Sequence, residues 1–196
     1  MNVIRSLERT REESLEVEGN IPDKLDEYLN ELEERYKYYF EVERNKEISG
    51  VSVNIFAQSS TEHFRQVLTK NIKIDQYYTK EYAIVNTIKG FGDKNEIEEF
   101  SKYLISLIDK MLIPSQEIMS TIFNGVLVST SGFSEEAINF AERFKFSKSF
   151  LLGLKGWCDI RFILIDLKGQ KLYSNKKGEE VLSAYKVKSF LGGDKT

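Results

Sequence analysis

The chain has little of what reactive or metal-binding sites are usually built from. Its 196 residues include one cysteine, one histidine, one tryptophan and two prolines. A single cysteine excludes an internal disulfide and fits a reducing compartment, so we expect a cytoplasmic protein. No apolar run is long enough to cross a bilayer, and we therefore expect no membrane contact. The charged segment 1–20 lacks the apolar stretch of a secretory signal.

Several motifs that carry common chemistry are also missing. The sequence contains no GxxxxGK[ST] loop, no GxSxG turn, and no CxxC or HExxH pattern. GFGD at 90–93 lacks the third glycine of a dinucleotide-binding loop, so we interpret it as a turn. His63 has no histidine or cysteine partners and is expected to be structural. Cys158 follows Trp157 with no obvious base, and we expect a buried, neutral thiol.

Charge of both signs is plentiful, but it is unevenly distributed. The formal net charge is −3. Residues 1–50 carry 8 basic and 14 acidic residues, whereas residues 141–196 carry 12 basic and 6 acidic residues. A basic C-terminal third is suited to contact DNA or RNA phosphates, and a scattered, solvated lysine surface is the alternative. Abundant Lys and Glu with few prolines also hint at a thermophile protein stabilised by surface charges.

The hydrophobic patterns predict one α/β domain over residues 22–190, with a flexible or helical arm at 1–21 and a flexible tail at 191–196. Apolar residues at steps of three and four predict helices, and alternating or short apolar runs predict strands. The predicted helices cover 22–43, 94–112, 115–123, 134–145 and 177–186. The predicted strands cover 50–58, 63–70 (after a turn at 59–62), 80–90, 125–129 and 149–154, with a hairpin in 159–175. This order predicts a mixed β-sheet flanked by helices on both faces.

The segment NGVLVSTSGFSEEAINFAERF (124–144) predicts a strand that leads directly into a helix. Thr130, Ser131 and Ser134 follow that strand, and Ser134 is the expected N-cap of the helix. Ligands bind at this edge of open α/β sheets, and free backbone N–H groups there favour anions. These three residues are therefore candidates for a phosphate contact, with an ordinary strand–helix connection as the alternative.

The passage GVLVSTSGFSEEAINFAERFKFSKSFLLGL, 30 of the 196 residues, resembles the closing part of Mrr-type restriction endonuclease domains. In that family a strand ending in Thr or Ser precedes the pattern F-[ST]-x-x-A-x-x-[FY]-A. Here the pattern is matched by Phe133, Ser134, Ala137, Phe140 and Ala141. The wider superfamily is the PD-(D/E)xK nucleases, whose core runs helix, three-stranded meander, crossover helix and fourth strand. The resemblance implies a restriction-endonuclease-like core over residues 22–129.

Such a nuclease site implies Mg²⁺ or Mn²⁺ held by carboxylates of adjacent strands, with a lysine that helps to activate water. The third predicted strand has Asn86 in place of the second carboxylate of the pattern, and Lys89 is displaced by one residue. Asp75 matches the first aspartate, and in another register Asn54 takes that position. Replacing a carboxylate by an amide removes charge that binds the metal, so the resemblance implies a degenerate catalytic motif.

We therefore expect a nuclease-like module that binds nucleic acid through its basic C-terminal third without efficient cleavage, and needs no cofactor. One alternative is an active nuclease that binds Mg²⁺ or Mn²⁺ through Asp75, with Lys89 and a first-helix glutamate, Glu34 or Glu33, as further catalytic residues. The other alternative is a non-catalytic assembly protein, whose acidic first helix pairs with another chain to give a homo-oligomer.

Overall fold

The computed structural model describes residues 21–67, 73–112, 118–150, 156–188 and 190, so most of the expected arm and tail lie outside it. The helices are α2 (Ile21–Lys37), α3 (Lys94–Met111), α4 (Glu135–Arg143) and the 3₁₀ helix η2 (Glu179–Tyr185). The strands are β1 (Glu41–Ile48), β2 (Val51–Val67), β3 (Lys73–Ile88), β4 (Ile118–Ser129), β5 (Ser147–Ser149), β6 (Trp157–Asp166) and β7 (Lys171–Ser174).

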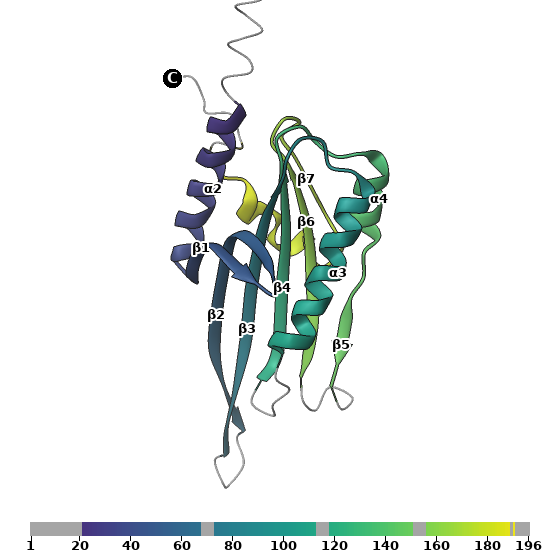
Figure 1. Cartoon of the computed structure of the whole chain (residues 1–196). Helices are drawn as coiled ribbons and strands as arrows, with labels where there is room; N and C mark the ends of the chain where they lie inside the picture. Colours follow the sequence, from purple (N-terminus) through teal and green to yellow (C-terminus); the bar gives the residue numbers. More distant parts are fainter. Residues whose placement is uncertain (1–20, 68–72, 113–117, 151–155, 189, 191–196) are drawn as a thin grey trace, which may run out of the picture.

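The seven strands form one mixed sheet in the order β1-β2-β3-β4-β6-β5, with β7 paired to β6 (Figure 1). The strands β1, β2 and β3 form an antiparallel meander, whereas β3, β4 and β6 run parallel to one another. Each parallel step is made through a helix, α3 before β4 and α4 before β6. Helices pack on both faces, and the predicted α/β class with a mixed sheet is confirmed.

The helix over 94–112 forms as its sequence predicts. The side chain of Asp93 accepts from the backbone N–H of Glu96, and the Glu96 side chain accepts from the N–H of Asp93, which closes a capping box. Ile97, Leu104 and Ile108 are fully buried at helical spacing. In α4, Ser134 caps the helix as predicted.

The predicted first helix, 22–43, is wrong in its last part, because α2 ends at Lys37 and β1 begins at Glu41. The side chains of β1 alternate between exposed and half-buried, which is the pattern of a strand at the edge of a sheet. Ser49 and Gly50 both adopt positive φ between the paired residues Ile48 and Val51. This two-residue turn favours a hairpin between β1 and β2.

The predicted turn at 59–62 is also wrong, because β2 continues through it to Val67 and the predicted strands 50–58 and 63–70 are largely one strand. Each residue of β2 from Ile55 to Val67 pairs with β3, which begins at Lys73 and not at residue 80. The polar residues of 59–62 are tolerated there because they lie exposed or half-buried.

The predicted helix at 115–123 is wrong where the structure describes it, since β4 begins at Ile118 and pairs with both β3 and β6. Pairing on both sides therefore overrides the helical spacing of this segment. The predicted strand at 149–154 is largely outside the described residues, and β5 ends at Ser149. The hairpin within 159–175 is confirmed as β6 and β7, and the last helix forms as η2.

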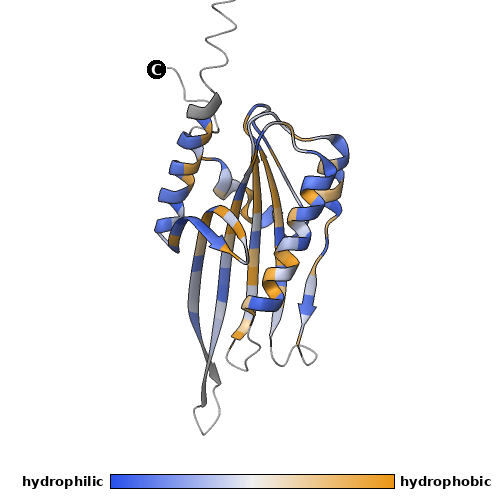
Figure 2. Ribbon diagram, in the orientation of Figure 1, coloured by the Kyte–Doolittle hydropathy of each residue, from blue (hydrophilic) through white to orange (hydrophobic). Residues whose placement is uncertain are grey.

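Two apolar clusters hold the helices against the sheet. On one face, α3 and α4 pack on residues such as Phe123 and Phe162. On the other, α2 and η2 pack on Val126 and Ile163, which are fully buried. Figure 2 shows apolar residues concentrated where helices cover the sheet, whereas the lower part of β2 and β3 is mostly hydrophilic. No helix in the described ranges is long and apolar enough to cross a membrane.

Candidate functional site

The structure does not bring the three candidate catalytic residues together. Asp75 lies on β3 opposite Arg65, and Lys89 is exposed just beyond the other end of the same strand. Strand geometry separates the two by roughly 45 Å. Glu34 is an exposed residue of α2 and pairs with Lys37 at 2.8 Å. One phosphate group therefore cannot contact all three residues.

The described residues also do not fit a Mg²⁺ or Mn²⁺ site. Among them, no three His, Cys, Asp or Glu side chains are close enough to hold a metal ion. Asn54, the alternative to the first aspartate, accepts hydrogen bonds at its Oδ1 from the backbone and the hydroxyl of Thr87. Asn54 therefore holds β2 against the end of β3, and no metal-dependent step follows from this geometry.

The polar groups of the loop after β4 form hydrogen bonds with one another and with adjacent backbone. The hydroxyl of Ser129 accepts from the backbone N–H groups of Ser131 and Gly132. The N–H of Ser134 donates to Gly92, and the Ser134 hydroxyl caps α4. Because the backbone N–H groups of Ser131 and Ser134 are already used, the geometry favours the ordinary strand–helix connection over a phosphate contact at these two residues. Thr130 is half-buried beside them, and its phosphate contact stays a prediction.

The described lysines of the C-terminal third lie exposed on several separate elements. Two of them form ion pairs, Lys148 with Asp109 at 2.9 Å and Lys177 with Asp159 at 3.1 Å. The others are exposed and carry no ion pair among the described residues, as both a phosphate-binding and a solvated surface would have it.

The remaining two candidates have structural roles. The ring of His63 stacks on Tyr77 with a centroid distance of 5.1 Å. Cys158 is fully buried, and burial, with a smaller contribution from the Asp159 carboxylate, raises the pKa of its thiol to about 12. The thiol is therefore neutral at physiological pH and unsuited to act as a nucleophile.

A polar cluster on the α2 face of the sheet was missed by the sequence interpretation. It joins Glu81 on β3, Asn124 on β4 and Arg161 on β6. Nδ2 of Asn124 donates to Oε1 of Glu81 at 2.8 Å, and the guanidinium of Arg161 donates to the same oxygen at 2.9 Å. Asn124 and Arg161 each stand directly between apolar residues of their strands, which is the signal that could have found them, whereas Glu81 lies in a mixed segment that gives no such signal.

The side-chain oxygen of Asn124 accepts no hydrogen bond from the other residues of the cluster. The residue is 3% exposed, and its Oδ1 has no hydrogen-bond donor within the described chain. Its amide nitrogen donates to Glu81 and to the backbone carbonyl of Tyr82, both of which are acceptors only. These two contacts exclude a flipped amide. A buried acceptor without a donor costs about 1–3 kcal/mol, so this oxygen lowers the stability of the cluster.

A cavity of about 240 Å³ opens beside this cluster, between α2, η2 and the sheet. Glu81 and Asn124 are its polar sheet residues. Its other lining residues come from α2, the α2–β1 turn and η2, and most are apolar or aromatic: Leu32, Arg35, Tyr36, Tyr39, Phe40, Val181, Ala184 and Tyr185. A mostly apolar hollow with few polar groups is the usual form of a small-molecule site.

Hydrogen bonds join α2 to η2, the two helices that line this cavity. The hydroxyl of Tyr36 donates to that of Tyr185 at 3.0 Å, and Tyr28 donates to the Tyr185 carbonyl at 3.1 Å. Arg35 donates to the carbonyl of Ala184 at 2.6 Å. Burial raises the pKa of the Tyr28, Tyr36 and Tyr185 phenols above the ordinary value, so all three stay neutral.

A second hollow, which we call the tyrosine groove, has a volume of about 530 Å³ and lies where β1 begins to pair with β2. Tyr38 and Tyr39 line it and are 81% and 82% exposed. The other lining residues supply two lysines, further aromatic rings and polar groups: Lys37, Phe40, Glu41, Gln58, Ser59, Ser60, Thr61, Lys80 and Tyr82. Exposed aromatic rings next to lysines are typical of surfaces that bind unpaired bases.

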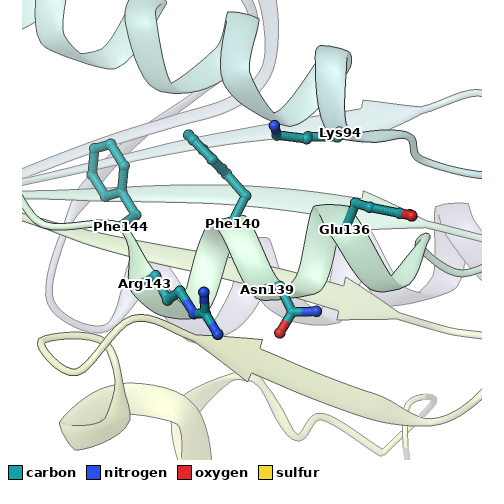
Figure 3. Close-up of a pocket in the computed structure, with 6 residues that line it drawn as sticks. All are labelled: Lys94, Glu136, Asn139, Phe140, Arg143 and Phe144. Atoms are coloured by element: carbon teal, nitrogen blue, oxygen red, sulfur yellow. The ribbon is translucent and has the colours of Figure 1, made fainter.

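A third hollow of about 430 Å³ lies between α3 and α4 (Figure 3). Phe140 and Phe144 point toward α3, with Lys94 and Glu136 beside them. Lys94 is paired with Glu98 at 3.2 Å, and the lining residues of this hollow are all exposed or half-buried. None of the residues that line this hollow is therefore a buried polar residue.

Fold and site together define an α/β domain with a mixed sheet between two helical layers and a ligand-sized cavity on the α2 face. The chain belongs to the family described as a domain of unknown function (DUF8052), whose model matches residues 24–187. The matched range spans nearly all of α2 and continues through η2, so it includes both the polar cluster and the tyrosine groove. No curated protein and no solved structure matches the chain.

Proposed function

We propose that the chain is a non-catalytic nucleic-acid-binding module on a restriction-endonuclease-like scaffold, and that it binds single strands in the tyrosine groove. The scaffold proposal is supported by the order of elements, which runs helix α2, meander β1 to β3, crossover helix α3 and parallel strand β4. That is the order which the resemblance to PD-(D/E)xK nucleases implies.

The observation that carries the binding proposal is the exposure of the adjacent rings of Tyr38 and Tyr39. Their centroids lie 6.5 Å apart with an angle of 49° between the ring planes, so each ring offers its own face. Single-strand binding proteins stack bases on such rings, because every base has a π-face. Bases in a duplex are already stacked, so single-stranded DNA or RNA is the expected ligand.

Lys80 supplies the positive charge for the phosphates. Its side chain lines the tyrosine groove, and no ion pair of Lys80 exists within the described residues. Lys37 lines the groove too but already pairs with Glu33 at 2.9 Å and with Glu34 at 2.8 Å. We therefore assign the main phosphate contact to Lys80, with the exposed C-terminal lysines as additional contacts.

The positions of the candidate catalytic residues support the proposal of binding without cleavage. Asp75 and Lys89 lie near opposite ends of β3, and Asn54 is bonded to Thr87. The proposal therefore includes no Mg²⁺ or Mn²⁺ and no cofactor.

Binding of fluorescent oligothymidylate and oligouridylate, measured by anisotropy against a duplex of equal length, tests this function. We expect single strands to bind more tightly than the duplex, and Tyr38→Ala to lose about tenfold in affinity. Phe91→Ala is the matched control, because Phe91 is an exposed aromatic residue outside the groove. Equal losses in both variants, or no binding by the native chain, would contradict the proposal.

Assembly is a second candidate function, supported by the open edge of β2. β1 pairs with β2 only as far as Gln58, whereas β2 continues to Val67 and pairs there with β3 alone. The side of this segment that faces away from β3 pairs with no other strand among the described residues, and an added strand would pair there. Light scattering after gel filtration tests it. A monomer at all concentrations would exclude self-assembly, and a defined dimer lost in Ser60→Pro or Thr61→Pro would support it.

A further inference from the structure

We propose that the cavity between α2, η2 and the sheet receives one base of the single strand that lies in the tyrosine groove. This inference rests on the proposed function and adds to it a pocket for an inserted base. The observation that carries it is that the two hollows adjoin, because Tyr39 and Phe40 line both of them. A strand bound in the groove therefore lies against two residues that also line the cavity.

The residues at the boundary of the two hollows belong to short, connected segments. Tyr39 and Phe40 lie between the end of α2 and the start of β1. Lys80 and Glu81 are consecutive on β3, and the first lines the groove whereas the second lines the cavity. Tyr39 is 82% exposed, and exposed side chains change rotamer within nanoseconds, so its ring is able to turn aside for a base.

The cavity has a size that suits one base. An apolar cavity of about 150 Å³ holds benzene, so about 240 Å³ has room for a single base with its exocyclic groups. Enzymes that take a base out of its strand hold it in a pocket where it stacks between aromatic and apolar side chains. The aromatic residues that line this cavity are Tyr36, Tyr39, Phe40 and Tyr185. Any base is able to stack on such rings, because every base has a π-face.

The charges of the two linings assign the phosphates to the groove. The charged residues that line the groove are Lys37, Lys80 and Glu41, two cations against one anion. Those that line the cavity are Arg35 and Glu81, one of each sign. The attraction for the backbone phosphates is therefore on the groove side, and the base is the part of a nucleotide that enters the cavity.

The cavity is already formed before a base enters. The hydroxyl of Tyr36 donates to that of Tyr185 at 3.0 Å, and Arg35 donates to the carbonyl of Ala184 at 2.6 Å. These bonds join η2 to α2, so the two helices that line the cavity are fixed against each other. A pocket that exists in the free protein adds little ordering cost to binding.

Anisotropy of a labelled oligothymidylate, measured with a cavity-filling variant of the full chain, tests the proposal. Ala184→Trp is designed to fill the cavity, because Ala184 is exposed and lines the cavity but not the groove. We expect a loss of about tenfold in affinity, because one base no longer stacks. Ser183→Trp is the matched control, because Ser183 is the exposed neighbour of Ala184 and lines neither hollow. It should bind as the native chain does.

An abasic oligomer of the same length shows whether the loss acts through a base. This strand keeps its phosphates but has no base to insert, so at low salt Ala184→Trp and the native chain should bind it equally. A loss as large as that for oligothymidylate would overturn the proposal. If Ala184→Trp fails to fold, Val181→Trp takes its place, because Val181 lines the cavity from the same helix.

The outcomes separate this inference from the proposed function. If the native chain binds no oligothymidylate, both are wrong. If the native chain binds and Tyr38→Ala weakens binding, but Ala184→Trp and Ser183→Trp bind equally, the groove is supported and base insertion is overturned.

Discussion

Asn124 and Arg161 occupy directly paired positions on β4 and β6, and both donate to the same oxygen of Glu81. The two donor–acceptor distances are 2.8 and 2.9 Å. One carboxylate therefore fixes the orientation of the Asn124 amide and balances the charge of Arg161. Residues that share a partner in this way do not act independently on mutation.

Removing the cation of this cluster should destabilise the domain. Arg161→Met leaves the partly buried Glu81 carboxylate without its guanidinium partner, and we expect a loss of about 2 kcal/mol in the free energy of unfolding by urea. Glu180→Gln is the control, because Glu180 is an exposed partner of Arg161 at 3.3 Å and should change stability by less than about 1 kcal/mol. The double variant Arg161→Met, Glu81→Gln should lose less than the sum of the single losses, and strict additivity would contradict the shared contact.

Gly125 is required for the packing of α3 on β4. A Cβ atom at this position would lie 2.1 Å from Cδ1 of Leu104, which is fully buried. Gly125→Ala should therefore cost about 1–3 kcal/mol in urea unfolding. The shorter side chain of Leu104→Val should relieve most of that cost in the double variant, and an unchanged cost would show that the overlap is not its cause.

Stability should fall at alkaline pH. Burial raises the pKa of three phenols above the ordinary value of 10.0 in the folded chain: Tyr28, Tyr36 and Tyr185. Above about pH 10 the folded chain therefore keeps these protons, whereas the unfolded chain releases them. The unfolded state then binds fewer protons, so this stabilisation is complete below about pH 10 and decreases above it, by up to about 1.4 kcal/mol per pH unit for each group. Tyr36→Phe should reduce the slope of stability against pH between about pH 10 and 11, and Tyr38→Phe, at an exposed residue, should not.

Cys158 should resist alkylation in the folded state. Burial raises the pKa of its thiol from 9.0 to about 12, so neither access nor a thiolate is available near pH 8. Mass spectrometry after iodoacetamide treatment should find the folded chain unmodified and the chain in guanidinium modified once. Equal rates in both states would contradict the placement of Cys158 in the core.

The sequence predicted those helices whose capping residues and apolar spacing are visible in the sequence itself. The helix α3 has a capping box at Asp93 and a continuous apolar stripe, and α4 has its N-cap at Ser134. The strand β1 was missed because three of its four exposed residues are charged, and a charged segment resembles the surface of a helix. The segments 59–62 and 118–123 were misassigned because pairing with neighbouring strands, which a single sequence does not display, decides their structure.

The polar cluster was harder to predict than the fold. Glu81, Asn124 and Arg161 are far apart in the sequence and form no motif, and only the order β3-β4-β6 brings them together. The predicted catalytic residues on β3 show the reverse relationship, because they are close in sequence and far apart in the structure. Asp75 and Lys89 are near in the sequence, but an extended strand carries them to distant places.

The central claim is that the tyrosine groove binds single-stranded nucleic acid, and the most direct test is the affinity of the native chain for oligothymidylate at a series of salt concentrations. Contacts from Lys80 and other lysines predict that the logarithm of the affinity falls linearly with the logarithm of the salt concentration. Stacking on Tyr38 and Tyr39 predicts that measurable binding persists at high salt and is lost in Tyr38→Ala. Absence of binding even at low salt would contradict the account.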